Sequence, residues 1–365
     1  MIDESLMRPE ERAAFALQAL YRKYGYLPFR MSRFEEYDFY ARNKDFLVSD
    51  RIITFTDRRG RLLALKPDVT LSIIKSGSDR PGCRQKLCYS EKVFRASGGL
   101  GEFKEITQAG LECIGDLDAY DSFEVTALAV KSLSLLGGAC VLNLSHLGLL
   151  NALLAALGED GSLARHAARC ISGRNVHELE TLCRGAGLPE ETVREFCFFA
   201  GLHAPLAAAL EELAPYCESE AALAALSELR CLSGMLDEAG LADKVFFDFS
   251  VVNNRKYYNG FVFQGFLADV PESVLAGGQY DGLMARMGRR ASGLGFAVYL
   301  DRLPVRVDAG GADVDVLLLY SDPASVSAAV RALQAAGKSV SAQREIPDKL
   351  RYRELVDLRG GAEHA

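Results

Sequence analysis

The sequence predicts an α+β fold in which helices flank an antiparallel sheet, and three observations lead to this class. Runs rich in β-branched and aromatic residues, separated by polar turns, fill much of residues 52–115 and return from residue 244. Alanine, leucine and glutamate dominate from about residue 150 to 240, where the strand signal disappears. The C-terminal end carries a short strand–helix–strand pattern. We therefore expect an α+β domain at 1–307 with a helical insertion at about 150–240, and a truncated C-terminal α/β segment at 313–365.

The composition favours a cytoplasmic protein without a metal centre. The chain has 365 residues, 49% of them hydrophobic, and a formal net charge of −7. This balance argues against a chain that mainly covers nucleic-acid phosphates, because that binding rests on clustered Lys and Arg. Nine cysteines without a CxxC pair and five dispersed histidines predict neither a disulfide framework nor a metal site. The N-terminal stretch is not a signal peptide, and the apolar runs are too short to span a membrane.

The N-terminal elements follow from turn and cap signals. Pro9 opens a helix that ends at Gly25, since proline suits the first helical turn and apolar residues recur at helical spacing. Residues 52–67 are expected to form a hairpin around a polar turn, and a helix follows over 68–77.

A second strand pair is expected at 86–96 and 102–115, joined by the glycine-rich loop SGGLG at 97–101. Two aspartates then precede a long helix over 119–137. After the helical insertion, the expected elements are strands at 244–254 and 257–267, helices after AGGQYDG (276–282) and within 291–303, and a βαβ-like unit of 314–322, 325–337 and 338–343.

Polar side chains in the middle of the strand at 102–115 are the first candidates for a site. Period two places Gln108 and Glu112 on one face, where a plain core would carry apolar residues. Arg95, at the end of the partner strand, could clamp a carboxylate or phosphate, and the amide and carboxylate could bind an ammonium or an imidazole. The alternative is an ordinary solvated sheet face with cross-strand pairs.

Several segments together resemble histidyl-tRNA synthetases and their paralogues, which share the class II aminoacyl-tRNA synthetase fold. LALKPDVT (63–70) is similar to that family's LRPEGT segment, and YSEKVFRASGGLGEFKEITQAGLECIG to its second class-defining motif. VVNNRKYYNGFVF resembles its RGLDYYN segment, AGGQYDGL its AGGRYDGL segment, and GLGFAVYLDRL its third motif. The resemblance covers about residues 9 to 305.

The resemblance implies a histidine pocket and phosphate-binding arginines. The pocket residues that carry over by position are Asp68, Thr70, Gln108, Glu112, Tyr257 and Tyr258. The phosphate-type arginines are Arg95 and Arg302, and the residues that bring backbone to the pocket are Gly277, Gly278 and Tyr280. Acceptor oxygens and phenolic hydroxyls suit a small cationic amino acid.

Departures from the family pattern fall on the chemistry with ATP. Asn253 and Asn254 stand where the family has its catalytic arginine and a glycine, and Ser97 replaces the FRxE glutamate. Glu102 lies where the motif-2 loop carries basic residues, and Ser32 replaces the motif-1 proline. Losing an arginine beside a triphosphate removes electrostatic stabilisation of the reaction. We therefore predict no catalytic residues and no cofactor.

These features resemble the regulatory subunits of ATP phosphoribosyltransferase, in which a synthetase paralogue no longer charges tRNA. LSHLGLLNALL (144–154) is similar to a GHxGxxxALL-type segment of that family. The resemblance implies a short-form catalytic phosphoribosyltransferase as partner in the first step of histidine biosynthesis, a homodimer within a hetero-oligomer, and histidine feedback. The short C-terminal segment argues against tRNA as a ligand. The alternatives are a divergent or split histidine–tRNA ligase with residual adenylation, and a stand-alone histidine sensor.

Overall fold

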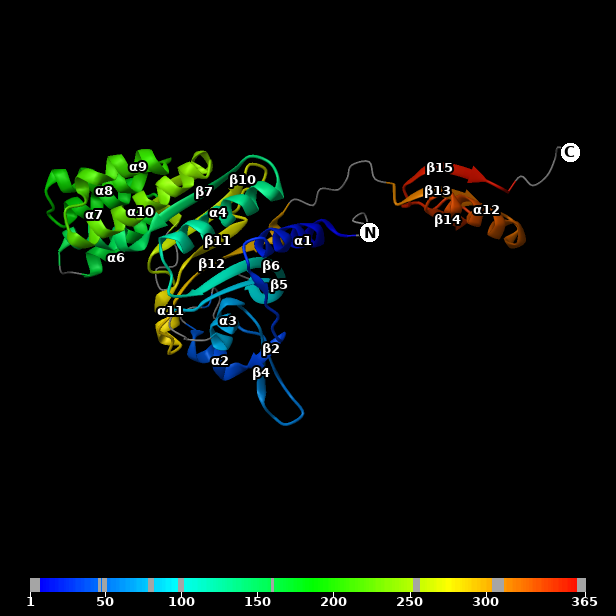
Figure 1. Ribbon diagram of the computed structural model, residues 1–365, viewed down its shortest axis with the longest axis horizontal. Coiled ribbons are helices and arrows are strands. Elements are labelled where there is room, and N and C mark those ends of the chain that lie inside the picture. Colours follow the sequence, from blue (N-terminus) through cyan, green and yellow to red (C-terminus); the bar gives the residue numbers. More distant parts are fainter. Residues whose placement is uncertain are drawn as a thin grey trace. The chain divides into compact units, whose positions relative to one another are not determined.

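The computed structural model divides into two compact units, Met1–Pro304 and Val305–Ala365, each with its own sheet (Figure 1). The residues it describes are 7–44, 47, 51–77, 82–97, 102–158, 161–251, 257–303 and 312–359.

A nine-stranded sheet organises the first unit and confirms the predicted antiparallel α+β class. Its order is β1 (Leu27–Pro28), β5 (Arg84–Ser97), β6 (Glu102–Gly115), β12 (Ser292–Tyr299), β11 (Leu275–Gln279), β10 (Phe261–Leu267), β7 (Cys140–His146), β9 (Val245–Asp248) and β8 (His203–Pro205). Neighbouring strands are antiparallel except for β1 with β5 and β7 with β9.

The hairpin β5–β6 is the longest pairing of this sheet, as the sequence predicted. Its register runs without a break from Arg84 opposite Gly115 to Ser97 opposite Glu102. β6 is exposed near its start and buried from Gln108 onward, so its second half lies in the interior. This burial places the polar residues of β6 under the elements that cover the sheet.

Helices α1 (Pro9–Arg22) and α4 (Ala119–Leu136) cover one face of the sheet (Figure 1). The N-cap Asp118 accepts from the backbone amides of Tyr120 and Asp121, which explains where α4 begins. The hydroxyl groups of Tyr21 in α1 and Ser132 in α4 share a hydrogen bond of 3.0 Å inside this core.

A smaller layer lies over the β5–β6 end of the sheet. It contains α2 (Tyr37–Arg42), α3 (Thr70–Ser76), α11 (Asp281–Arg286), and a three-stranded sheet of β2 (Phe34–Glu36), β4 (Leu62–Leu65) and β3 (Thr54–Thr56). The β3–β4 pair is the predicted hairpin, and Asp57 closes its turn by accepting from the amides of Arg59 and Arg61. A second hydrophobic cluster joins this layer to Tyr89 and Ile114 of the large sheet.

The predicted helical region packs at the other end of the sheet (Figure 1). Its helices are α5 (Leu147–Leu154), α6 (Gly161–Ser172), α7 (Val176–Gly185), α8 (Glu190–Gly201), α9 (Leu206–Leu213) and α10 (Glu220–Glu238). Side chains at helical spacing form its interior, for example Leu229, Leu232 and Leu236 of α10. The short strand β8 inside this region was not predicted.

The segment 291–303 corrects the sequence-based expectation of a helix that carries Arg302. Residues Ser292–Tyr299 form β12, and Arg302 lies in the 3-10 turn Leu300–Arg302 that follows. The small residues that were expected to precede a helix include glycines of a central strand, where they admit the bulky side chains of neighbouring elements. Strand β7 was likewise not predicted, since no element was assigned to residues 138–149.

The second unit is a three-stranded parallel sheet with one helix. The described elements are β13 (Val314–Leu319) in the centre, β14 (Val340–Gln343), β15 (Tyr352–Asp357) and α12 (Pro323–Ala335). The strand–helix–strand part was predicted, and β15 is an addition. Within the described residues of both units, we find no helix that has the length and apolar character needed to cross a membrane.

Candidate functional site

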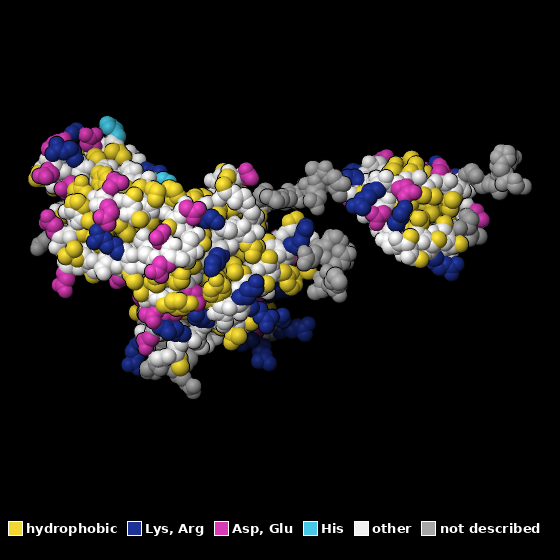
Figure 2. Space-filling model, turned by 45° about the horizontal axis from the view of Figure 1, so that its top comes forward, with side chains coloured by type: hydrophobic (Ala, Val, Ile, Leu, Met, Phe, Trp, Pro, Cys, Tyr) yellow, Lys and Arg dark blue, Asp and Glu magenta, His cyan; other side chains and the backbone are white. Residues whose placement is uncertain are grey.

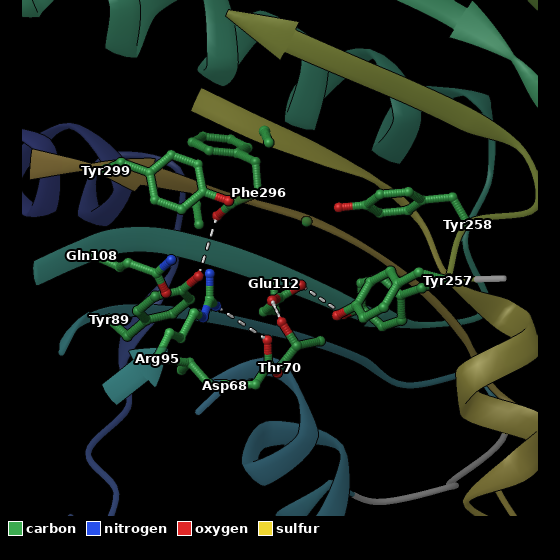
Figure 3. A pocket seen from close by; sticks show the side chains of 15 residues that line it. Asp68, Thr70, Tyr89, Arg95, Gln108, Glu112, Tyr257, Tyr258, Phe296 and Tyr299 are labelled. Atoms are coloured by element: carbon green, nitrogen blue, oxygen red, sulfur yellow. Dashed lines mark hydrogen bonds and ion pairs between the residues drawn. The ribbon is translucent and has the colours of Figure 1, made fainter. Parts of the chain in front are cut away.

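A polar pocket lies where β6 and β12 meet α3 and the segment around Tyr257 (Figure 3). The volume of this cavity is about 70 Å³, several times the roughly 10–15 Å³ that one water needs. The residues that line it are Asp68, Val69, Thr70, Tyr89, Arg95, Gln108, Glu112, Tyr257, Tyr258, Ala276, Tyr280, Gly295, Phe296, Ala297 and Tyr299.

Glu112 is the central acid of this pocket, and two hydroxyl groups hold its carboxylate. Thr70 Oγ1 donates to Glu112 Oε1 and the Tyr280 hydroxyl donates to Oε2, both at 2.6 Å. Burial raises the pKa of Glu112 to about 8, the two hydroxyl hydrogen bonds act to lower it, and nearby Asp68 raises it. A cation in the pocket would favour the ionised form of this carboxyl group.

Asp68 and Arg95 form a second charged pair in the wall. Arg95 Nη2 lies 3.7 Å from Asp68 Oδ2, and Arg95 Nε donates to the carbonyl of Pro67 at 2.8 Å. Asp68 Oδ1 accepts from the amide of Leu71, which fixes the carboxylate at the start of α3. Burial raises the pKa of Asp68, and Arg95 opposes that effect. Two carboxyl groups therefore share the pocket with one lining arginine.

Gln108 brings a hydrogen-bond donor that lacks a protein partner. Its side chain is 2% exposed, and Nε2 has no hydrogen bond among the described residues. Figure 3 shows this amide close to Arg95 and Tyr299 at the edge of the cavity. Because an unsatisfied buried donor costs about 1–3 kcal/mol, its position indicates a ligand or an ordered water.

Tyrosines enclose the pocket on the other side. The rings of Tyr257 and Tyr258 meet edge to face with centroids 4.8 Å apart, and the ring of Tyr257 lies 6.0 Å from that of Tyr280. Figure 3 shows the Tyr258 hydroxyl directed into the cavity. Burial raises the pKa values of Tyr257 and Tyr258 well above that of an ordinary tyrosine, so both side chains remain neutral phenols.

Two glycines leave the floor of the pocket open. Gly110 lies between Gln108 and Glu112 on β6, and a Cβ there would be 2.6 Å from the Tyr89 hydroxyl oxygen. Gly295 pairs with Glu112 across β6–β12, and a Cβ there would be 1.9 Å from Glu112 Oε2. No real side chain tolerates that approach, so glycine at 295 is required by the position of the carboxylate.

The structure brings most of the predicted site residues together. All six predicted pocket residues line the cavity, and so do Arg95 and Tyr280. Gly277 and Gly278 lie in β11 and are not among the lining residues, whereas their neighbour Ala276 is.

Arg302, the second predicted phosphate-type arginine, is not among the residues that line this pocket. Its Nη1 donates to the carbonyl of Ser273, its Nε lies 3.5 Å from Glu272, and its guanidinium stacks over the Tyr299 ring at 4.3 Å. The 3-10 turn that replaces the expected helix directs it to these partners.

Tyr89 and Tyr299 are the main lining residues that sequence reasoning did not assign. Period two on β5 puts Tyr89 on the same face as Arg95, so a signal for it was present. Tyr299 was missed because β12 was expected to be helical.

The departures from the family pattern are only partly described. Asn253 and Asn254 lie outside the described residues, as does most of the loop 97–101. Ser97 ends β5, opposite an exposed Glu102 at the start of β6. Ser32 is exposed, and its hydroxyl accepts from the amide of Phe34 at 3.3 Å.

Comparison with known proteins gives consistent matches along the first unit. A family model described as histidyl-tRNA synthetase matches residues 2–303. An ATP phosphoribosyltransferase regulatory subunit of Moorella thermoacetica is 30% identical over 307 residues, which cover 82% of this chain and 79% of that protein. One from Desulfitobacterium hafniense is 29% identical over 296 residues, covering 80% of this chain and 76% of that protein.

A solved structure has the same fold. It is the ATP phosphoribosyltransferase regulatory subunit/histidyl-tRNA synthetase from Bacillus halodurans, with a TM-score of 0.77. The match covers 97% of this chain and 95% of that one at 24% identity.

Proposed function

This chain belongs to the histidyl-tRNA synthetase family, and from that premise we propose that it is the regulatory subunit of an ATP phosphoribosyltransferase in histidine biosynthesis. Curated relatives with that name align with about four fifths of this chain. As a regulatory subunit it acts on a separate catalytic chain, a short-form phosphoribosyltransferase of the cytoplasm. We further propose that it does so as a homodimer within a hetero-oligomer.

The pocket around Glu112 carries the proposal that the regulatory ligand is histidine. Two carboxyl groups, a free amide donor and phenolic hydroxyls converge on one small cavity. This set suits a ligand with an ammonium group and a second polar end, since the carboxylates provide charge-assisted acceptors. A water-filled pocket of the same residues is the competing interpretation.

Calorimetric titration with histidine tests this ligand. Glu112→Gln should weaken histidine binding at least tenfold, because it removes a charge-assisted contact to the ammonium or imidazolium group. Lys104→Gln, on an exposed part of the same strand, serves as the matched control and should bind as the parent chain does. Equal affinity in the parent and Glu112→Gln chains would show that histidine binds elsewhere.

We propose that the chain does not form histidyl-adenylate. Arg95 is the one arginine among the described lining residues, and it is already engaged by Pro67 and Asp68. Arg302 lies outside the lining, and Asn253 replaces the arginine of the family motif. Without arginines free to meet a triphosphate, the negative charge of the reaction lacks its usual partners.

The competing enzyme function is a histidine–tRNA ligase, and pyrophosphate exchange separates the two. The regulatory proposal predicts no histidine-dependent exchange, whereas a ligase would turn over at roughly one per second or faster. The second unit also lacks the basic excess expected for a tRNA surface, with seven acidic and seven basic residues over 312–359. Four of those basic residues are paired with acids, and Figure 2 shows both charges mixed on its visible face.

Reconstitution with a short-form catalytic subunit tests the main proposal. The chain alone should show no phosphoribosyl transfer, and the mixture should form a stable complex with a gain of activity that histidine reduces. A mixture that neither assembles nor gains activity would contradict it. Histidine binding without assembly would identify the third alternative, a stand-alone sensor.

A further inference from the structure

Helices α6 and α7 bring together three side chains of metal-binding type, away from the residues that line the pocket. His166 and Cys170 are four residues apart on α6, so they lie on one face of that helix. Glu178 reaches them from the first turn of α7. One ligand atom of each, an imidazole nitrogen, the thiol sulfur and a carboxylate oxygen, lies within 4.8 Å of the other two.

One of the mutual distances is close to that of two ligands that share one ion. His166 Nε2 already lies 3.1 Å from Glu178 Oε1. Nitrogen, oxygen and sulfur atoms bound tetrahedrally to one zinc are separated by about 3.3–3.5 Å, because the bonds are about 2.0–2.3 Å long. The Cys170 sulfur lies within 4.8 Å of the other two atoms and would have to approach them for all three to bind one ion.

Contacts around the cluster hold Glu178 in place. Asn175, the N-cap of α7, donates from Nδ2 to Glu178 Oε2 at 2.6 Å and accepts from the Glu178 amide. This leaves Oε1 directed at His166. Orientation of a ligand carboxylate by a neighbouring hydrogen bond is typical of metal sites.

The tight connection between the helices sets their mutual position. The amide of Asn175 donates to the carbonyl of Cys170 at 2.8 Å, and Arg174 has a positive φ of 50°. Arg174 is the one non-glycine residue with positive φ in the described part of the chain. Its guanidinium binds Asp248 of β9 at 2.6 Å, so the turn is anchored to the sheet.

Metal binding at this cluster would change the charge of two of its ligands. A bound cation replaces the thiol proton and neutralises Glu178 at once. Arg165 and Arg169 line an adjacent hollow of about 400 Å³ together with His166, which leaves the solvent side of the cluster open to water.

We propose that His166, Cys170 and Glu178 form a binding site for a divalent transition-metal ion, with zinc as the preferred ion and water as its fourth ligand. The ligand set mixes imidazole nitrogen, thiolate sulfur and carboxylate oxygen, all of which zinc accepts. An ion there clips α6 to α7 within the helical region. This site shares no residue with the proposed histidine pocket, so the result of one test does not decide the other.

Titration of the full chain with Co²⁺, followed by displacement with Zn²⁺, tests the site. One equivalent of Co²⁺ should give the visible bands of a tetrahedral thiolate complex at micromolar metal, and Zn²⁺ should remove them. His166→Ala and Glu178→Gln should each weaken Co²⁺ binding at least tenfold. Cys170→Ser should lose the thiolate band, and zinc should raise the Tm of the parent chain but not of these variants.

Two matched controls guard against adventitious binding. Cys231→Ser removes an exposed thiol of α10, and His177→Ala removes an exposed imidazole beside Glu178. Both should bind the metal as the parent chain does. The assignment is overturned if His166→Ala, a partly exposed position that should fold normally, binds Co²⁺ unchanged, if no single equivalent binds, or if either control loses the site.

Discussion

At the scale of single residues, Glu112 shows how burial and hydrogen bonding set opposite demands on one carboxyl group. Burial penalises its charge, while Thr70 and Tyr280 donate to its oxygens and favour the charge. The result is a pKa of about 8. A group whose folded-state pKa is raised contributes stability below its unfolded pKa and loses it as pH rises through the folded one.

Glu112→Gln should therefore change how stability depends on pH. Between the ordinary carboxyl pKa of about 4.3 and about 8, the parent chain loses stability relative to Glu112→Gln as pH rises. The slope of the difference should be on the order of 1 kcal/mol per pH unit. Urea unfolding of both chains at several pH values measures it, and parallel profiles would contradict a raised pKa at this residue.

Gly295 makes a sharper residue-scale prediction. Because a Cβ would lie 1.9 Å from Glu112 Oε2 and 2.4 Å from the Leu111 carbonyl, Gly295→Ala must displace the strand or the carboxylate. We expect a loss of about 1–3 kcal/mol in stability and loss of histidine binding. Gly282→Ala, in α11 with nothing within 4 Å of its Cβ, is the control and should be neutral or slightly stabilising. Equal effects in the two chains would refute the close approach.

At the scale of elements, the sequence predicted those helices and strands whose residue pattern lies within one short segment of the chain. The hairpin β5–β6 was found from its alternation and glycine-rich connection, and that alternation also put Gln108 and Glu112 on one face. The helices of the inserted region were found from apolar residues at helical spacing. The antiparallel class followed from these pieces, and the family resemblance supplied the pocket.

The elements that were missed depend on distant partners. β12 has glycines at 293 and 295, which were placed before an expected helix. In the structure, Tyr280 and Glu112 occupy the space that these glycines leave. The strand β8 has three residues and is defined by its pairing with β9. Arg302 was expected on a helix and Tyr299 was not assigned to the pocket, because a residue's direction changes when its element does.

Substitutions at Arg174 test how the turn between α6 and α7 is stabilised. Replacing it by Ala removes the contact with Asp248, which is worth about 1 kcal/mol because Arg174 is half exposed. Arg174→Gly loses the same contact but relieves the positive φ of 50°, which costs a non-glycine residue about 1–2 kcal/mol. Glycine should therefore be better tolerated than alanine here, the reverse of the usual order. Chemical denaturation ranks the two variants, and a more stable Arg174→Ala chain would argue against strain in this turn.

At the scale of the whole molecule, each unit completes its own sheets. The nine strands of the large sheet all come from the first unit, and the three parallel strands all come from the second. The two hydrophobic clusters of the described chain contain no residue beyond Leu303. Every residue that lines the pocket also belongs to the first unit.

A chain of residues 1–304 should therefore fold and bind histidine as the full chain does. Removing the second unit leaves no strand of the large sheet without its partner and deletes no residue of either cluster, so stability should be retained. A cut at residue 290 is the control: it deletes β12, which pairs with both β6 and β11, and it should abolish cooperative unfolding. Thermal unfolding and calorimetric titration of the three chains decide the matter. A fall in Tm of the 1–304 chain by more than about 4 °C, equivalent to roughly 1–2 kcal/mol for a domain of this size, or a loss of its histidine affinity, would mean that the second unit supports the pocket.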